Sequence, residues 1–137
     1  MKKVFSPEEA NRTLPLVKRI VADIVEQHKL FGATRAEYAK LQSQKTLEPA
    51  QKTRKSALES TIKSAVAEMQ GYVAELEQLG IAIKSFDEGL IDFPSSRDGR
   101  EVFLCWKHGE ESVEYWHEPD KGYAGRQPIE KAAFSAK

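Results

Sequence analysis

The sequence lacks several features that would point to a secreted or a membrane protein. It has one cysteine in 137 residues, so no disulfide can form within the chain, and a secreted disulfide framework is excluded. No apolar run approaches the ~18 residues that a membrane-spanning helix needs. The N-terminus, MKKVFSPEEANRTLP, has two lysines but no apolar segment of the kind found in signal peptides. We therefore expect a cytosolic protein with no membrane partner.

An excess of one charge sign is also absent, because 21 Lys and Arg residues balance 21 Asp and Glu residues. Locally the charge is uneven: residues 40–55 contain one acid, Glu48, and five cations, which are Lys40, Lys45, Lys52, Arg54 and Lys55. Such a segment is able to contact nucleic acid, but charged runs are more often solvated surface, so we do not favour that partner. The sequence has no nucleotide-binding fingerprint, and we expect no cofactor.

Two long helical patterns occupy residues 1–80. Ser6, Pro7 and Glu9 are typical of a helix start, since they supply an N-cap, a first-turn proline and a capping box. Pro15 predicts a kink after a short first segment over residues 7–13. A seam with alternating steps of three and four residues follows, and its members are Leu14, Val17, Val21, Ile24, His28, Phe31, Arg35 and Tyr38. This seam becomes polar halfway along.

A second and more regular seam is followed by Gly80, a typical helix stop. Its members are Leu58, Ile62, Ala65, Met69, Tyr72, Leu76 and Leu79. Pro49 fits the first turn of this second helix. Two long helices joined by a short turn predict an antiparallel helical hairpin in the form of a two-helix coiled coil. Neither helix can bury its seam alone, so each must pack on the other and on a second copy or the C-terminal segment. We expect a homo-oligomer, namely a dimer, formed through the helices.

After Gly80 the apolar residues recur with a period of two. The alternation over residues 81–86, 90–93, 101–107 and 112–117 predicts a small antiparallel sheet of three or four strands. Pro94 is expected to end the second strand, and a polar loop is expected from Ser95 to Gly99. The predicted fold class is α+β. Residues 81–137 carry the sheet and a polar C-terminal loop, and they form one compact unit with the hairpin.

Three candidate metal ligands, Cys105, His108 and His117, lie within thirteen residues of one another. Their spacing lacks the paired ligands of a structural zinc site, so a metal is not favoured. Glu118 or Asp120 would have to supply a fourth ligand. A nucleophilic role for Cys105 is not favoured either, because a cysteine in the middle of a strand is more often buried and inert.

A second group of candidate residues surrounds the C-terminal loop. His117 and Glu118 are the candidate catalytic residues, because a histidine followed by carboxylates can act as an acid or base near neutral pH. The candidate ligand-binding residues are Asp92, Arg100, His117, Glu118, Gly122, Gly125 and Arg126, since the glycines allow close approach and the arginine can bind an anion. The alternative is structural. His117 would end a strand, and Arg126 would form an internal ion pair with Asp92, Glu101 or Glu118.

Three segments carry a family resemblance: FSPEEANRTLP, LGIAIKSFDEGLIDFP and DGREVFLCWKHGEESVEYWHEPDKGYAGRQPI. In these segments the chain resembles an uncharacterised bacterial family, the domain of unknown function 2203. The resemblance covers both ends of the chain and omits the tip of the hairpin. It implies a helical hairpin with a small sheet, and it brings no catalytic assignment.

The leading functional hypothesis is a non-enzymatic binding or assembly module. The helices would mediate association, and the C-terminal loop would recognise a protein or a small anionic ligand. Two alternatives stay open. One is a small enzyme that uses His117 and Glu118 as the acid–base pair and Arg126 as the anion site. The other is nucleic-acid contact through the basic residues 40–55.

Overall fold

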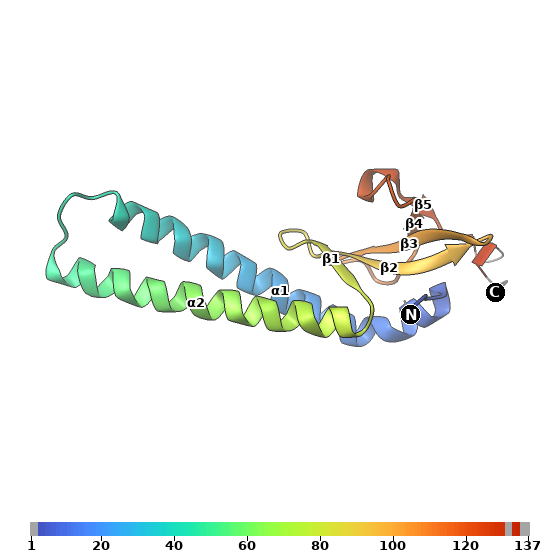
Figure 1. Cartoon of the computed structure of the whole chain (residues 1–137), viewed down its shortest axis with the longest axis horizontal. Coiled ribbons are helices and arrows are strands. Elements are labelled where there is room, and N and C mark those ends of the chain that lie inside the picture. Colours follow the sequence, from blue (N-terminus) through green and yellow to red (C-terminus); the bar gives the residue numbers. More distant parts are fainter. Residues whose placement is uncertain (1–2, 131–132, 135–137) are drawn as a thin grey trace.

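A computed structural model of the chain describes residues 3–130 and 133–134 (Figure 1). Two long antiparallel helices, α1 (Pro7–Gln42) and α2 (Pro49–Gln78), precede a five-stranded antiparallel sheet. The strands are β1 (Ala82–Ser85), β2 (Leu90–Arg97), β3 (Arg100–Lys107), β4 (Tyr115–His117) and β5 (Gln127–Pro128), paired in that order, and a 3-10 turn, η1 (Tyr123–Gly125), precedes β5. The α+β prediction is confirmed, but the sheet has five strands rather than three or four. The missed strand, β5, has only two residues, too few for a periodic pattern.

Helix α1 begins where the sequence predicts and continues through Pro15 as one helix, and the kink expected there stays a prediction. The Ser6 hydroxyl accepts a hydrogen bond from the backbone N–H of Glu9 at 3.1 Å, and the Glu9 carboxylate accepts one from the Ser6 N–H at 2.9 Å. The helix runs through Pro15 because the residues around it are held by packing. Leu14 and Val17 are 3% and 0% exposed. Their burial offsets the backbone hydrogen bond that proline removes.

The seam of α2 is confirmed, and the seam of α1 is confirmed in its first half only. The buried residues of α2 are Leu58, Ala65, Met69 and Leu76, all members of the predicted set. In the second half of α1, Thr34 is buried and Arg35 is exposed, so the inward position lies one residue earlier than the spacing predicts. A small side chain fits between two closely packed helices, whereas a guanidinium keeps its hydration only outside them.

One apolar core joins the sheet to the hairpin. Leu104 and Trp106 of β3 lie in this core together with Val17 and Val21 of α1 and Leu76 of α2. The sheet therefore covers the end of the hairpin where α1 begins and α2 ends, as Figure 1 shows. The rest of the hairpin, up to the turn between Gln42 and Pro49, projects away from the sheet.

Strand β2 is longer than the sequence predicts and ends in a tight turn. It continues through Pro94, whose carbonyl accepts a hydrogen bond from the Phe5 N–H at 2.7 Å. The expected polar loop from Ser95 to Gly99 was wrong, because Arg97 pairs directly with Arg100. Asp98 and Gly99 form a two-residue turn with φ angles of 53° and 79°. Asp-Gly suits such a turn because both residues tolerate positive φ.

Candidate functional site

A polar cluster lies on the sheet face that points away from the helices. Asp92 of β2 stands opposite Cys105 of β3, and His117 of β4 stands opposite Phe103, two residues before Cys105. Directly opposite residues share one face of a sheet, and so do residues two apart along a strand. The three side chains therefore point the same way from three adjacent strands. Leu104, which points the opposite way, belongs to the apolar core.

The ligand atoms of this cluster lie close together and out of solvent. One carboxylate oxygen of Asp92, the Cys105 Sγ and one ring nitrogen of His117 all lie within 4.8 Å of one another. Asp92, Cys105 and His117 are 4%, 0% and 3% exposed. Among the residues that the structure describes, this is the group that could hold a metal ion. His108, the third candidate ligand, lies outside it, in the turn after β3 and against the Trp106 ring.

The hydrogen-bond partners of His117 indicate which of its ring nitrogens carries a hydrogen. Its Nδ1 lies 2.8 Å from the backbone carbonyl oxygen of Glu118, and its Nε2 lies 3.0 Å from Asp92 Oδ1. A carbonyl oxygen only accepts, so Nδ1 carries a hydrogen and donates it. In a neutral ring, Nε2 then presents a lone pair to the carboxylate, which also only accepts when ionised. A proton or a metal cation has to lie between the two atoms.

Cys105 is poorly suited to act as a free nucleophile. Burial raises the pKa of its thiol to about 12, and the nearby positive charge of Arg126 offsets only part of that effect. The thiol is therefore protonated at neutral pH, whereas the nucleophilic form of cysteine is the thiolate. Both ring nitrogens of His117 already face other groups, so this histidine does not activate the thiol in the manner of a Cys-His pair.

Arg126 forms an internal lock, with a partner that the sequence did not predict. Its Nη2 donates to both carboxylate oxygens of Glu110 at 2.8 Å, and its guanidinium lies 4.0 Å and 4.6 Å from the ring centres of Tyr115 and Tyr123. The expected partners were Asp92, Glu101 and Glu118. The sequence did not predict Glu110 as the partner of Arg126, because Glu110 lies in the turn before β4. Only the pairing of β3 with β4 places this turn next to the C-terminal loop. Glu110 also accepts a hydrogen bond from the Lys107 N–H at 2.9 Å.

The remaining predicted residues have separate roles. The Glu118 carboxylate accepts hydrogen bonds from Arg100 Nη1 at 3.0 Å and 3.3 Å, so the Glu118 side chain is paired with Arg100 rather than with His117. Gly122 has a φ of 62°, which favours glycine, and a Cβ on Gly125 would collide with the Lys121 side chain. The backbone conformation at Gly122 and the close contact at Gly125 thus explain why glycine occupies both positions around η1.

The structure brings together residues that the sequence had placed in two different groups. Asp92 was predicted as a ligand-binding residue and Cys105 as a candidate metal ligand, while His117 belonged to both groups. Their convergence depends on the register of three strands, which no short-range pattern encodes. One signal was present: Asp92 is a carboxylate in the middle of the otherwise apolar run Leu90 to Phe93. A buried strand rarely contains such a residue without a partner.

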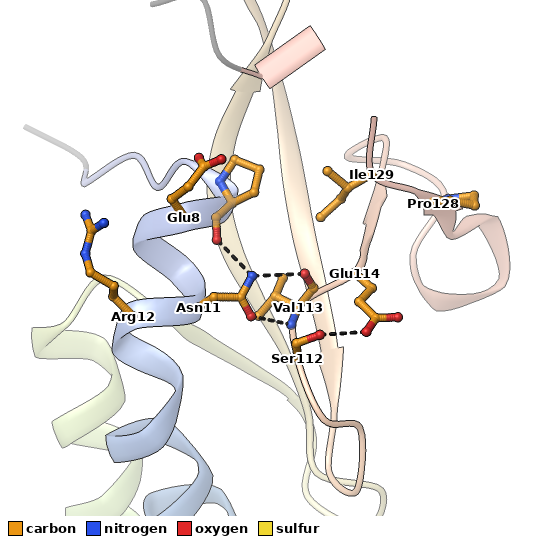
Figure 2. Close-up of a pocket in the computed structure, with 9 residues that line it drawn as sticks. Glu8, Asn11, Arg12, Ser112, Val113, Glu114, Pro128 and Ile129 are labelled. Carbon is orange, nitrogen blue, oxygen red and sulfur yellow. Dashed lines mark hydrogen bonds between the residues drawn. The ribbon is translucent and has the colours of Figure 1, made fainter. Parts of the chain in front are cut away.

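A groove that the sequence did not reveal lies between the start of α1 and the segment after β3 (Figure 2). Its volume is about 740 Å³. Asn11 bridges its two sides: its side chain accepts a hydrogen bond from the Val113 N–H at 2.7 Å and donates to the Val113 carbonyl at 3.2 Å. It also donates to the Pro7 carbonyl. Asn11 therefore fastens the helix to the sheet, and its polar atoms are used internally.

The comparisons with known proteins identify the chain at the level of its family. None of the helices in the described part of the chain combines the length and apolar composition required to cross a membrane. Searches among curated proteins and among solved structures each found no match. A family described as "Uncharacterized conserved protein (DUF2203)" matches residues 3–129, which include both helices and all five strands. The chain belongs to this DUF2203 family of uncharacterised conserved proteins.

Proposed function

We propose that this chain is a non-enzymatic assembly module that forms a homodimer through the distal half of its helical hairpin. The distal half consists of residues 28–42 of α1 and residues 49–66 of α2. The observation that carries the proposal is a groove of about 590 Å³ on one side of this half. Its lining combines half-exposed apolar residues with charged ones, and comprises Phe31, Arg35, Tyr38, Glu59, Ile62 and Lys63.

The burial of the hairpin supports association at this place. In the distal half, Thr34 of α1 is buried, as are Leu58 and Ala65 of α2, while Phe31 and Ile62 remain partly open to solvent. A pair of helices has one shared seam and leaves the flanks of that seam uncovered. In four-helix bundles a second hairpin covers such flanks. The distal half is free to accept one because it projects away from the sheet (Figure 1).

The charges around the groove favour a second copy of this chain as the occupant. The rim carries two cations, Arg35 and Lys63, and one acid, Glu59. A two-fold interface places a surface patch against itself, so a patch with both signs can pair its cations with the acid of the other copy. A strongly acidic or basic partner would leave charges of one sign unpaired. The absence of net charge on the whole chain also reduces repulsion between copies.

The candidate catalytic residues support the non-enzymatic part of the proposal. His117 is turned toward Asp92, Glu118 toward Arg100, and Arg126 toward Glu110. Each side chain is thereby used within the fold, whereas acid–base chemistry on a bound anion would need the three to face one substrate.

The proposal is tested by the mass of the full chain in solution. We expect light scattering after size exclusion to give a dimer from low micromolar concentration upward. Ile62→Glu introduces a charge into the apolar part of the groove and should give a monomer of unchanged helix content by circular dichroism. Leu30→Glu is the matched control, because Leu30 is exposed and shares the opposite flank of α1 with Glu37, seven residues later.

Two results would contradict the proposal. One is a wild-type chain that stays monomeric up to submillimolar concentration. The other is a dimer that both substitutions disturb equally, since this would place the interface elsewhere on the chain.

A further inference from the structure

We propose that Asp92, Cys105 and His117 bind one Zn²⁺ ion that links strands β2, β3 and β4. This inference is independent of the dimer, because the cluster lies on the outer face of the sheet and the groove lies on the distal hairpin. Either proposal can therefore fail without the other.

The chemistry of the three side chains selects the metal. Zn²⁺ is bound in proteins by cysteine sulfur, histidine nitrogen and carboxylate oxygen, and this cluster offers one of each. Ca²⁺ and Mg²⁺ take oxygen ligands almost alone, so a site with sulfur and nitrogen does not suit them. Zn²⁺ binding displaces the proton of the Cys105 thiol, and the resulting thiolate and the Asp92 carboxylate together carry two negative charges, which the divalent cation neutralises. That neutrality is what a fully buried site requires.

The orientation of His117 matches that of a metal-bound histidine. A zinc-binding histidine normally donates its second ring N–H to a carbonyl or carboxylate, which holds the ring in place. Here Nδ1 donates to the Glu118 carbonyl at 2.8 Å, and the lone pair of Nε2 points into the cluster. Nε2 and Asp92 Oδ1 lie 3.0 Å apart, and when no proton lies between them both are acceptors that a metal cation can bridge.

The distances are close to those of a formed site. Zinc bonds of about 2.0–2.1 Å to nitrogen and oxygen and about 2.3 Å to sulfur, in tetrahedral geometry, place the ligand atoms roughly 3.3–3.6 Å apart. The atoms of this cluster lie within 4.8 Å of one another. Small side-chain rotations would close the remaining gap. Three protein ligands leave a fourth position for a water molecule.

The arrangement also explains why the sequence pattern did not reveal a zinc site. Ligand pairs such as Cys-x-x-Cys come from one turn or one hairpin. In this chain each ligand comes from a different strand, and the spacing between them is set by the strand lengths and connections. A metal here would fasten the short strand β4, which has three residues, to the longer β2 and β3.

The test begins with the full chain purified without chelators or a metal-affinity tag. We expect elemental analysis to find about one Zn²⁺ per chain, either as purified or after incubation with Zn²⁺ and gel filtration. Loading with Co²⁺ should give the near-ultraviolet band of a sulfur-to-cobalt charge transfer together with the intense visible bands of a tetrahedral site. The Cys105→Ser variant should lose the charge-transfer band, and His117→Gln and Asp92→Asn should lose stoichiometric binding.

His108→Gln is the matched control, because it removes a histidine from the neighbouring turn but leaves the cluster intact. It should bind as the wild type does. If a variant of the cluster fails to fold, the melting temperature of the wild-type chain decides instead, and it should rise with Zn²⁺ and fall with a chelator. No stoichiometric metal after loading, a Co²⁺ complex without sulfur charge transfer, or a melting temperature indifferent to Zn²⁺ would overturn the inference.

Discussion

The two halves of helix α1 use their apolar residues in opposite ways. Leu14, Val17 and Ile24 in the first half are at most 3% exposed, because the sheet and α2 both cover them. In the second half, Phe31 and Tyr38 have only α2 beside them and stay partly exposed. One continuous helix is thus packed against both the sheet and α2 at one end and against α2 alone at the other. Local unfolding should begin at the second end, where burial is least.

The ion pairs show the same contrast. In the sheet region the Arg126 and Glu110 side chains are 11% and 27% exposed, and two tyrosine rings cover the guanidinium. In the distal hairpin the Arg54 and Glu37 side chains are 57% and 44% exposed. Both pairs have good geometry. Water screens the second pair, so the two should differ in their effect on stability far more than their similar distances suggest.

The largest expected effect is on the apolar core of the sheet. Leu104→Ala should lower the free energy of unfolding by about 2–5 kcal/mol, because it opens a cavity at a fully buried position. Leu30→Ala in the distal half should change it by about 0.5 kcal/mol or less, since Leu30 is 45% exposed. Urea denaturation followed by far-ultraviolet circular dichroism measures both. Equal losses for the two variants would refute the contrast between the halves.

An intermediate effect is expected for the Arg126 lock. Arg126→Ala leaves the Glu110 carboxylate half-buried without its cation and uncovers two tyrosine rings, which should cost about 1–3 kcal/mol. Arg126→Lys should recover only part of this, because an ammonium can reach the carboxylate but lacks the planar guanidinium that lies over the Tyr115 and Tyr123 rings. Arg54→Ala is the control and should have little effect. The same urea titration applies, and full rescue by lysine would show that charge alone matters.

The smallest effect is expected for the exposed pair of the hairpin. The hydrogen bond from Arg54 lowers the pKa of Glu37 below its ordinary value of 4.5. A carboxyl group whose pKa is lower in the folded state stabilises the fold at any pH above its unfolded-state pKa. This contribution is lost as the pH falls through the folded-state pKa. Glu37→Gln should therefore lower the thermal midpoint slightly at neutral pH and not at strongly acidic pH. High salt should also remove the difference. A difference that persists in acid would rule out this origin.

The helical features could be read from the sequence because they depend on neighbours along the chain. The capping box at Ser6 and the regular seam of α2 involve residues three or four apart, which the helix itself brings together. The Asp98–Gly99 turn is local in the same sense, although its role in a long hairpin was not predicted. Helix α1 stays continuous through Pro15 because the core on both sides of it outweighs a local penalty, and the kink expected there stays a prediction.

The contents of the candidate site were decided by tertiary structure. Glu110 became the partner of Arg126 because strand pairing placed the turn beside the loop, and sequence separation carries no information about that distance. Asp92, Cys105 and His117 converge because three strands pair in one register, and a shift of one residue would turn a side chain to the opposite face. The sequence by itself determined the helical hairpin, the α+β class and the residue types available for chemistry. Only the packed sheet decided which of them meet, because its register sets distances through space.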